Sequence, residues 1–340
     1  MYSMYDEKKI KTEPYLPKTV FRGFAGKRWW WFIIKSVQRG IKSRVVVLSH
    51  INLLLAAYLI KLLLPKTKVI LTVHDIDGSE QLSIHNKRML KCIDLVITVS
   101  DSAKEKAKLL FDLPGERFHV LNNCLDPFLP TPSADESRRN ECRISYGIAE
   151  NDFLLMTLSS LSSKGKKRGY DQVLVALKKL HATFPNVKYL FVGKYDVDEK
   201  MRLNDVIHDL GIEDDVIFTG FVPDSVIGDY YNMSDLYIVP GEKEGFGFRY
   251  IEALYYNKPV IVLKVDGTAD NLYGNSLGTI IDLRNQDEII ATIQKVIANV
   301  KAFMPDCKLV LEMFSYPIYK NKWKTILDGV HSPKLKVLSS

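Results

Sequence analysis

Short runs of aliphatic and β-branched residues alternate with longer amphipathic segments along most of the chain. Such runs lack the polar alternation of a half-exposed strand and are typical of strands that are buried on both faces. Because helical patterns separate them, we expect parallel sheets with helices on both faces. In the first part of the chain the pattern predicts strands at residues 44–50, 68–74, 95–100 and 119–121, and helices at 51–64, 83–91 and 102–110.

Residues 123–150 interrupt this alternation with Pro and polar residues, which are typical of a linker. The alternation then restarts and predicts a second doubly wound α/β domain. Sheets of this kind bind ligands at the carboxyl ends of their strands, and two that face one another leave a cleft. The second part is expected to contain strands at 153–158, 188–192, 216–219, 236–239, 260–263 and 278–281, and helices at 170–183, 198–210, 224–232, 247–256 and 287–301.

The break and the restart define the expected domains. A doubly wound domain normally begins with a strand, but here the first strong strand starts near Arg44. We therefore expect a truncated N-terminal domain that lacks its first strand. We place the N-terminal domain at residues 1–130, a linker at 131–150, the C-terminal domain at 151–310, and a helix or tail at 311–340, for which a return to the N-terminal domain is one option.

Composition narrows the class of protein. The 340 residues are 46% hydrophobic and 26% charged, which is ordinary for a soluble protein of two domains. The four cysteines are scattered and form no pattern typical of disulfides or metal ligands, which favours a reducing compartment. The longest apolar run, residues 51–64, is too short to span a bilayer, and no signal peptide opens the chain. We therefore expect a cytoplasmic protein.

The net charge of +7 is unevenly distributed. Residues 18–44 contain eight Lys or Arg residues and no acid, and the aromatic run Trp29-Trp30-Trp31-Phe32 lies among them. Basic residues beside indoles suit an anionic membrane surface, which predicts a peripheral contact at the inner face of the plasma membrane. The alternative is a helix that packs its aromatic face on the core and leaves its basic face in water. We expect no nucleic-acid partner.

The most informative segment follows a predicted strand that ends at Pro240. Gly245 and Gly247, on either side of Phe246, permit a close approach of a ligand to the backbone, and the helix after them directs free N–H groups outward. A pyrophosphate suits that position. The carboxylates of Glu244 and Glu252 can accept hydrogen bonds from sugar hydroxyls.

This segment resembles the Glu-x7-Glu motif of retaining GT-B glycosyltransferases, especially glycosyltransferase family 4. The context carries the resemblance: Gly220-Phe-Val-Pro-Asp224, Asn232-Met-Ser-Asp-Leu-Tyr-Ile-Val-Pro240, Glu244-Gly-Phe-Gly247 and Lys258-Pro-Val-Ile261 follow in the order and spacing of that family. The resemblance covers roughly residues 70–300. It implies two Rossmann-like domains that face a cleft, with a nucleotide-sugar donor bound mainly by the second.

The resemblance also implies roles for particular residues. Glu252 is expected to bind the ribose and Glu244 the transferred sugar, with solvated surface acids as the alternative for both. Where the family has an Arg and a Lys for the diphosphate, this chain has Ser160 and Arg168, which is a departure. Arg168 can still bind a phosphate through two hydrogen bonds, and Lys167 is a candidate for the second charge. The other donor-binding candidates are Lys194, Phe221, Val222, Gly267 and Thr268.

In the first domain, three polar residues follow predicted strands. The resemblance makes His74 a contact of the donor sugar, with a satisfied core or capping histidine as the alternative. His50 and Asn52 are candidates for the acceptor side. Ser100 follows another strand, where capping of the next helix is at least as good an explanation as binding.

The expected activity follows from these roles. Neither an Asp-x-Asp in strand context nor a His/Cys cluster with ligand spacing occurs in the sequence, so we expect no metal and no cofactor besides the donor. We expect a retaining transfer from a UDP- or GDP-linked sugar to a glycan or a lipid-linked acceptor in bacterial surface polysaccharide synthesis. The alternatives are another GT-B enzyme, such as an epimerase or a phosphorylase, and a non-catalytic nucleotide-binding protein.

Overall fold

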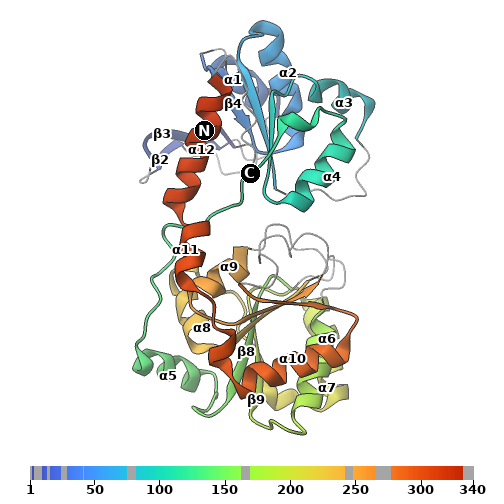
Figure 1. Ribbon diagram of the computed structural model, residues 1–340, viewed down its shortest axis with the longest axis vertical. Coiled ribbons are helices and arrows are strands. Elements are labelled where there is room, and N and C mark those ends of the chain that lie inside the picture. Colours follow the sequence, from blue (N-terminus) through green and yellow to red (C-terminus); the bar gives the residue numbers. More distant parts are fainter. Residues whose placement is uncertain are drawn as a thin grey trace. The chain divides into compact units, whose positions relative to one another are not determined.

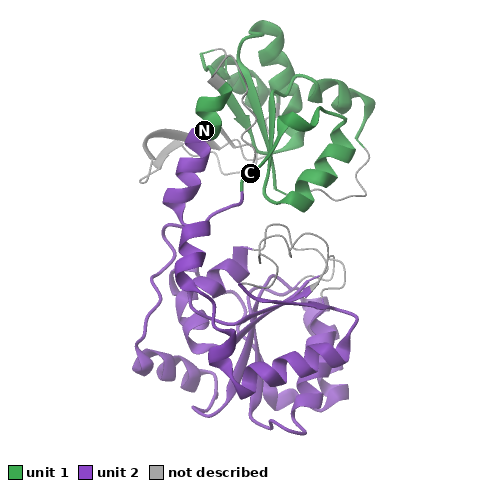
Figure 2. Cartoon of the chain, in the orientation of Figure 1, with its two compact units in different colours: residues 1–121, 326–340 green, residues 122–325 purple. Residues whose placement is uncertain are grey.

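The computed structural model of the chain divides into two compact units (Figures 1 and 2). Unit 1 comprises Met1–Leu121 and Ile326–Ser340, and unit 2 comprises Asn122–Thr325. Each unit is built around its own parallel sheet, which confirms the expected α/β class with two parallel-sheet domains. The structure describes residues 2–3, 10–13, 16–23, 29–40, 42–74, 82–161, 169–241, 248–264 and 277–331.

Unit 1 contains a four-stranded parallel sheet in the order β4-β5-β6-β7. Its buried core joins the apolar strand residues to the inner faces of the helices, as the unbroken β-branched runs predict. The strands are β4 (Val45–Leu48), β5 (Lys68–Val73), β6 (Leu95–Thr98) and β7 (Phe118–Val120), and the helices are α1 (Trp29–Gly40), α2 (Leu54–Leu63), α3 (Ile84–Leu90) and α4 (Asp101–Phe111).

Three strands before α1 were not expected from the sequence. They form a separate sheet in the order β1-β3-β2, in which β2 and β3 are antiparallel. The strands are β1 (Tyr2–Ser3), β2 (Ile10–Glu13) and β3 (Leu16–Gly23). Short strands that mix charged and apolar residues lack the continuous apolar runs that mark the strands of the parallel sheets.

Unit 2 contains a six-stranded parallel sheet in the order β10-β9-β8-β11-β12-β13. Helices α6, α7 and α10 lie on one side of it, and α8, α9 and α11 lie on the other (Figure 1). The chain reverses its direction of winding between β8 and β11, and ligands of such sheets bind outside the carboxyl ends of the strands at this point. The strands are β8 (Phe153–Leu158), β9 (Val187–Val192), β10 (Val216–Phe218), β11 (Leu236–Pro240), β12 (Val260–Lys264) and β13 (Thr279–Asp282).

The helices of unit 2 follow the predicted pattern with small shifts at their ends. The segment expected as a helix over residues 224–232 begins with a 3-10 turn at Asp224–Val226 before α8. The α-helices are α5 (Glu136–Ser145), α6 (Tyr170–Leu180), α7 (Val197–Leu210), α8 (Ile227–Met233), α9 (Phe248–Tyr255), α10 (Gln286–Ala298) and α11 (Cys307–Phe314). Helix α12 (Tyr316–His331) begins in unit 2 and ends in the segment that belongs to unit 1.

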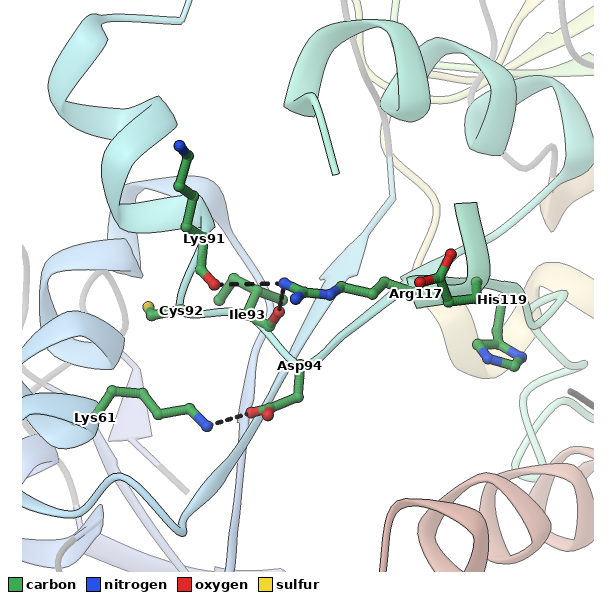
Figure 3. A pocket seen from close by; sticks show the side chains of 8 residues that line it. Lys61, Lys91, Cys92, Ile93, Asp94, Arg117 and His119 are labelled. Atoms are coloured by element: carbon green, nitrogen blue, oxygen red, sulfur yellow. Dashed lines mark hydrogen bonds and ion pairs between the residues drawn. The ribbon is translucent and has the colours of Figure 1, made fainter. Parts of the chain in front are cut away.

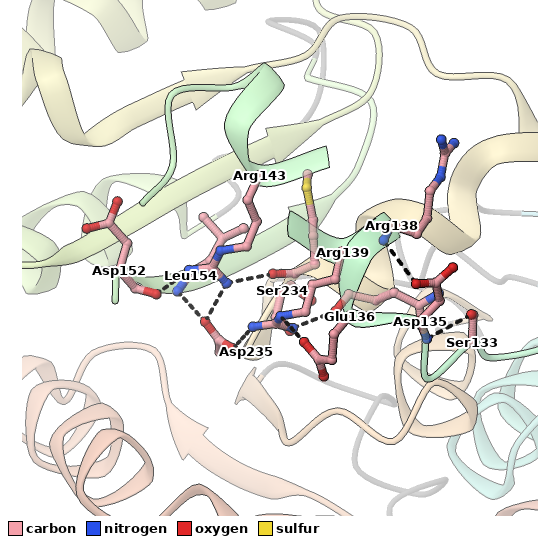
Figure 4. A network of polar contacts seen from close by, with 12 residues as sticks. Ser133, Asp135, Glu136, Arg138, Arg139, Arg143, Asp152, Leu154, Ser234 and Asp235 are labelled. Atoms are coloured by element: carbon pink, nitrogen blue, oxygen red, sulfur yellow. Dashed lines mark hydrogen bonds and ion pairs between the residues drawn. The ribbon is translucent and has the colours of Figure 1, made fainter. Parts of the chain in front are cut away.

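The segment expected as a linker contains α5, which is held to unit 2 by arginines (Figure 4). Arg139 Nη2 lies 2.6 Å from Asp235 Oδ1, and Arg143 Nη1 lies 3.3 Å from Asp235 Oδ2. Arg143 is 1% exposed and also donates to the carbonyl oxygens of Met233 and Ala149. Residues 131–150 therefore differ from a free linker, and unit 2 begins at Asn122 rather than near residue 151.

Lys258 is buried beside this cluster. Its ammonium group donates to the carbonyl oxygens of Asn232 at 3.0 Å and Ser234 at 2.9 Å. Burial, followed by the positive charge of Arg139, lowers the pKa of Lys258 to about 8. As the pH rises, Lys258 in the folded protein therefore loses its proton at a lower pH than it does in the unfolded chain.

This pKa predicts a pH dependence of stability. Between pH 8 and the ordinary lysine value of 10.5, the unfolded chain binds more protons at this position than the folded chain. The free energy of unfolding should therefore rise with pH, by about 1 kcal/mol from this group between pH 7 and pH 9. Urea unfolding of the wild type and Lys258→Met over this range measures it. A difference between the two proteins that stays constant with pH would contradict the assignment.

Candidate active site

Two neighbouring strands of unit 2 end in glycines that allow them to approach closely. Gly193 follows β9 with φ of 129°, and a Cβ atom there would collide with the carbonyl oxygen of Ser159. Its N–H donates to the carbonyl oxygen of Gly220 at 3.1 Å. Only glycine fits at position 193, because both the left-handed backbone and the missing space exclude a side chain.

The residues after these glycines form an exposed surface of a cation and an aromatic ring. Lys194 Nζ lies 4.6 Å from the centre of the Phe221 ring, and Phe221 is 65% exposed. Val222 beside it is buried. A ring that is open to solvent at the carboxyl end of a sheet can stack with a planar base. Three of the residues predicted to hold the donor thus lie together.

Glu252 is the best defined of the predicted site residues. It lies on α9, is 8% exposed, and accepts hydrogen bonds on both of its oxygens. Tyr231 of α8 donates to Oε2 at 2.7 Å, and Arg249 Nη1 lies 3.0 Å from Oε2 and 3.2 Å from Oε1. The alternative of a solvated surface acid does not describe this buried carboxylate. Neither Arg249 nor Tyr231 was identified from the sequence.

Glu252 also lines a pocket of about 480 Å³ within unit 2. The pocket lies between α8, α9, residues 124–130 and Tyr316. Its lining includes the acids Asp126, Asp224 and Glu252, and aromatic rings such as Phe248. Carboxylates next to aromatic rings suit a ligand that carries hydroxyl groups and a planar or apolar face.

Three sequence segments with predicted donor contacts start at the carboxyl ends of β8, β11 and β12, which are adjacent in the sheet. Ser160 lies just past β8 and is exposed. Helix α9 begins at Phe248, directly after the segment of Glu244. The other predicted residues of these segments lie outside the described residues: Lys167, Arg168, Glu244, Gly245, Phe246, Gly247, Gly267 and Thr268.

The predicted residues of unit 1 also follow its strands. His74 comes directly after β5, and burial lowers the pKa of its imidazole below 6.5. It is therefore neutral at pH 7, with one nitrogen that donates and one that accepts. The Ser100 side chain accepts from the N–H of Ala103 and caps α4, which fits the capping explanation.

His50 and Asn52, predicted on the acceptor side, take part in a local cap. His50 Nδ1 accepts from the backbone N–H of Asn52 at 3.1 Å, at the start of the 3-10 turn Ile51–Leu53. This hydrogen bond places the imidazole proton on Nε2, which can still donate to a ligand. Both residues are exposed, so their predicted contact with an acceptor stays a prediction.

A second pocket, of about 490 Å³, lies in unit 1 at the opposite ends of the strands (Figure 3). Asp94, just before β6, forms an ion pair with Lys61 at 2.7 Å. Arg117, just before β7, donates to the carbonyl oxygen of Ile93 at 3.0 Å. None of the predicted site residues is among the residues that line this pocket.

The residues that the structure describes include neither a metal-binding cluster nor a membrane-spanning helix. Across those residues, no group of three or more His, Cys, Asp or Glu side chains is placed to hold a metal ion. Of the helices within the same ranges, none has the length and apolar character that crossing a bilayer requires.

The fold and the site define a two-domain α/β protein with a candidate nucleotide pocket in its second unit. The sequence profile of Glycosyl transferases group 1 matches residues 138–303, and that of Glycosyltransferase Family 4 matches residues 4–127. Together the two profiles cover most of both units. The chain belongs to the GT-B glycosyltransferases of the family 4 type.

Individual relatives share this class. An uncharacterized glycosyltransferase of Methanocaldococcus jannaschii is 25% identical over 60% of this chain and 51% of its own length. The GDP-mannose-dependent alpha-(1-6)-phosphatidylinositol monomannoside mannosyltransferase of Mycolicibacterium smegmatis is 25% identical over 51% of this chain and 45% of its own. The chain thus spans about half the length of the curated relatives it matches.

A solved structure supports the fold over most of the chain. The crystal structure of Anabaena HepE in complex with UDP and glucose superimposes with a TM-score of 0.74 over 91% of this chain and 86% of HepE. The two sequences are 21% identical, so this likeness establishes the shared fold.

Proposed function

We propose that the protein transfers a sugar from a nucleotide-diphosphate sugar to a hydroxyl group of an acceptor. The observation that carries the proposal is the buried carboxylate of Glu252, which lines a pocket. Glu252 lies on α9, the helix that follows Glu244 in the sequence. The amino end of a helix favours a diphosphate, and the carboxylate can accept from the ribose. HepE is described with UDP and glucose, and the M. smegmatis relative uses GDP-mannose, so UDP- and GDP-linked sugars are the proposed donors.

The proposed transfer retains the anomeric configuration. The acceptor hydroxyl attacks on the face that the nucleotide leaves, while Glu244 and His74 hold the sugar. Arg168 and the backbone N–H groups of residues 245–247 stabilise the negative charge that develops on the departing diphosphate. We propose that these groups, with the N-terminus of α9, serve in place of a divalent metal. Transfer that is unchanged after chelation with EDTA would support this, and restoration by Mg²⁺ alone would contradict it.

A donor screen followed by product analysis tests the function. UDP-linked sugars, GDP-linked sugars and the free nucleotides as controls are compared by thermal shift. A ligand that binds only the folded state raises the melting temperature. Mass spectrometry then follows the donor that binds, with glycan and lipid-linked acceptors. Transfer to an acceptor is the expected result. Conversion of the donor without an acceptor would indicate an epimerase, dependence on free phosphate would indicate a phosphorylase, and binding without turnover would indicate a non-catalytic protein.

We propose a lipid-linked or surface-glycan acceptor at the membrane, because α1 exposes an aromatic and basic face. Phe32 and Ile33 pack inward against Ala56 of α2, whereas Trp30 is 67% exposed and Trp31 is 56% exposed. The buried face of α1 fits the alternative of a helix that packs on the core, and the exposed tryptophans support the proposal of a membrane contact. The M. smegmatis relative is named for a phosphatidylinositol monomannoside, which supports the proposal of a role in bacterial surface polysaccharide synthesis.

Vesicle sedimentation tests the membrane contact. The wild type should bind phosphatidylglycerol vesicles at low salt, and replacing Trp30 and Trp31 with Ser should weaken binding by at least about tenfold, because two indoles leave the interface. Leu109→Ser is the matched control, since Leu109 is a hydrophobic residue of unit 1 that is 89% exposed. Equal binding of the wild type and the tryptophan variant to these vesicles would contradict the proposed membrane contact.

A further inference from the structure

The carboxylate of Glu252 is held by hydrogen bonds from two directions. Oε2 accepts from Tyr231 at 2.7 Å and from Arg249 at 3.0 Å, whereas Oε1 accepts from a single group among the described residues, Arg249 at 3.2 Å. An ionised carboxylate can accept about four hydrogen bonds. Oε1 therefore keeps the greater capacity to accept from a ligand in the adjoining pocket.

Tyr231 is the rigid side of this arrangement. It is fully buried, and its ring stacks on Tyr256 with centroids 5.0 Å apart and an interplanar angle of 14°. The Tyr256 hydroxyl donates to the carbonyl oxygen of Pro130 at 2.5 Å, which attaches the pocket wall of residues 124–130 to the same cluster. Tyr231 alone would fix one oxygen of Glu252 and leave the carboxylate plane free to rotate.

Arg249 is the exposed side. Its side chain is 43% exposed and lines the pocket, and among the described lining residues it is the one Lys or Arg beside Asp126, Asp224 and Glu252. It lies in the first turn of α9, where the helix dipole disfavours a cation. The helix dipole therefore does not favour an arginine here, whereas the ion pair with both oxygens of Glu252 does.

We propose that Arg249 is a positioning residue that fixes the Glu252 carboxylate for the ribose diol and so makes the site select ribonucleotides over 2′-deoxyribonucleotides. This inference rests on the proposed function, because it assumes a nucleotide in this pocket. Without Arg249, Glu252 keeps its hydrogen bond from Tyr231 but loses the fixed orientation of Oε1. The affinity for ribonucleotides then falls. The affinity for 2′-deoxyribonucleotides falls less, because their sugar offers one hydroxyl fewer to Glu252.

Isothermal titration of UDP, GDP and their 2′-deoxy forms into the full chain tests the proposal. The wild type should prefer the ribonucleotide by about tenfold. Arg249→Met should bind the ribonucleotide about tenfold more weakly and the 2′-deoxy form nearly as well as before, so that the preference falls toward unity. Arg249→Lys, which keeps the charge, should retain part of it.

Arg202→Met provides a matched control in the same unit. Arg202 pairs with Glu199 three residues before it, and the exposed fractions of the two side chains, 43% and 11%, equal those of Arg249 and Glu252. Its loss should leave the ribose preference unchanged, which separates positioning from a general loss of stability.

The outcomes distinguish this inference from the function on which it rests. A wild type that binds neither UDP nor GDP would overturn both. A wild type that prefers the ribonucleotide, together with an Arg249→Met variant that keeps the full preference, would overturn the inference alone. If Arg249→Met does not fold, as judged by its melting curve, Arg249→Lys decides: a full wild-type preference would overturn the inference, and a reduced one would support it.

Discussion

Glu244→Ala is expected to lower kcat/KM for sugar transfer by about 100-fold, with most of the loss in kcat. Glu244 follows β11 and precedes α9 in the sequence, and the resemblance to the family motif implies a contact with the transferred sugar. Doubly wound folds bind ligands at the carboxyl ends of strands such as β11. A carboxylate that holds the sugar as the bond to the diphosphate breaks acts mainly in the transition state. Steady-state kinetics with the donor identified by thermal shift measures the effect.

Glu242→Ala is the control for this prediction. Glu242 belongs to the same segment and carries the same charge, but it is outside the motif. It should change kcat/KM by less than about threefold. The assignment of roles fails if both Glu244→Ala and Arg168→Ala retain more than about a tenth of wild-type transfer.

Asp235→Ala is expected to destabilise unit 2 by about 3–5 kcal/mol. The Asp235 carboxylate accepts from Arg139 at 2.6 Å, from Arg143 at 3.3 Å and from the N–H of Leu154 at 2.8 Å. Its removal leaves the buried guanidinium of Arg143, whose side chain is 2% exposed, without a carboxylate partner among the described residues. Urea unfolding should show a much lower midpoint for unit 2.

Asp229→Ala is the control, because it removes an exposed ion pair between α5 and α8 and leaves the partner of the buried Arg143 in place. Asp229 pairs with Arg138 at 2.6 Å, but the Arg138 side chain is 53% exposed. An exposed pair contributes less than about 1 kcal/mol, so this variant should unfold nearly as the wild type does. Equal losses in the two variants would show that burial of Arg143 does not control the stability of the cluster.

Much of the fold was predictable because its signal is local. The runs 153–158 and 236–239 are apolar on both sides of the strand, and such runs have few stable positions other than the interior of a parallel sheet. The glycine-rich segment and Pro259 fix the ends of α9 in the same way, and the structure places that helix at Phe248–Tyr255.

Helix α5 could not be predicted because its signal is not local. Its sequence, Glu-Ser-Arg-Arg-Asn-Glu-Cys-Arg-Ile-Ser, has almost no apolar face. What holds it are contacts of Arg139 and Arg143 with Asp235, more than ninety residues along the chain. A polar segment that docks by buried ion pairs has the same pattern as a solvated linker.

The candidate site also has features that the sequence predicts and features that depend on packing between helices. The spacing of Arg249 and Glu252 on one helix face is visible in the sequence, and an i,i+3 ion pair could have been expected from it. The hydrogen bond from Tyr231 could not, because it depends on how α8 packs beside α9. The motif therefore identified the carboxylate, and the structure was required to find the groups that orient it.

A crystal structure of the protein with bound UDP or GDP tests the central claim most directly. We expect the diphosphate at the amino end of α9 and a ribose hydroxyl within hydrogen-bonding distance of Glu252. A nucleotide bound elsewhere, with the region around Glu252 closed by the protein's own side chains, would contradict it.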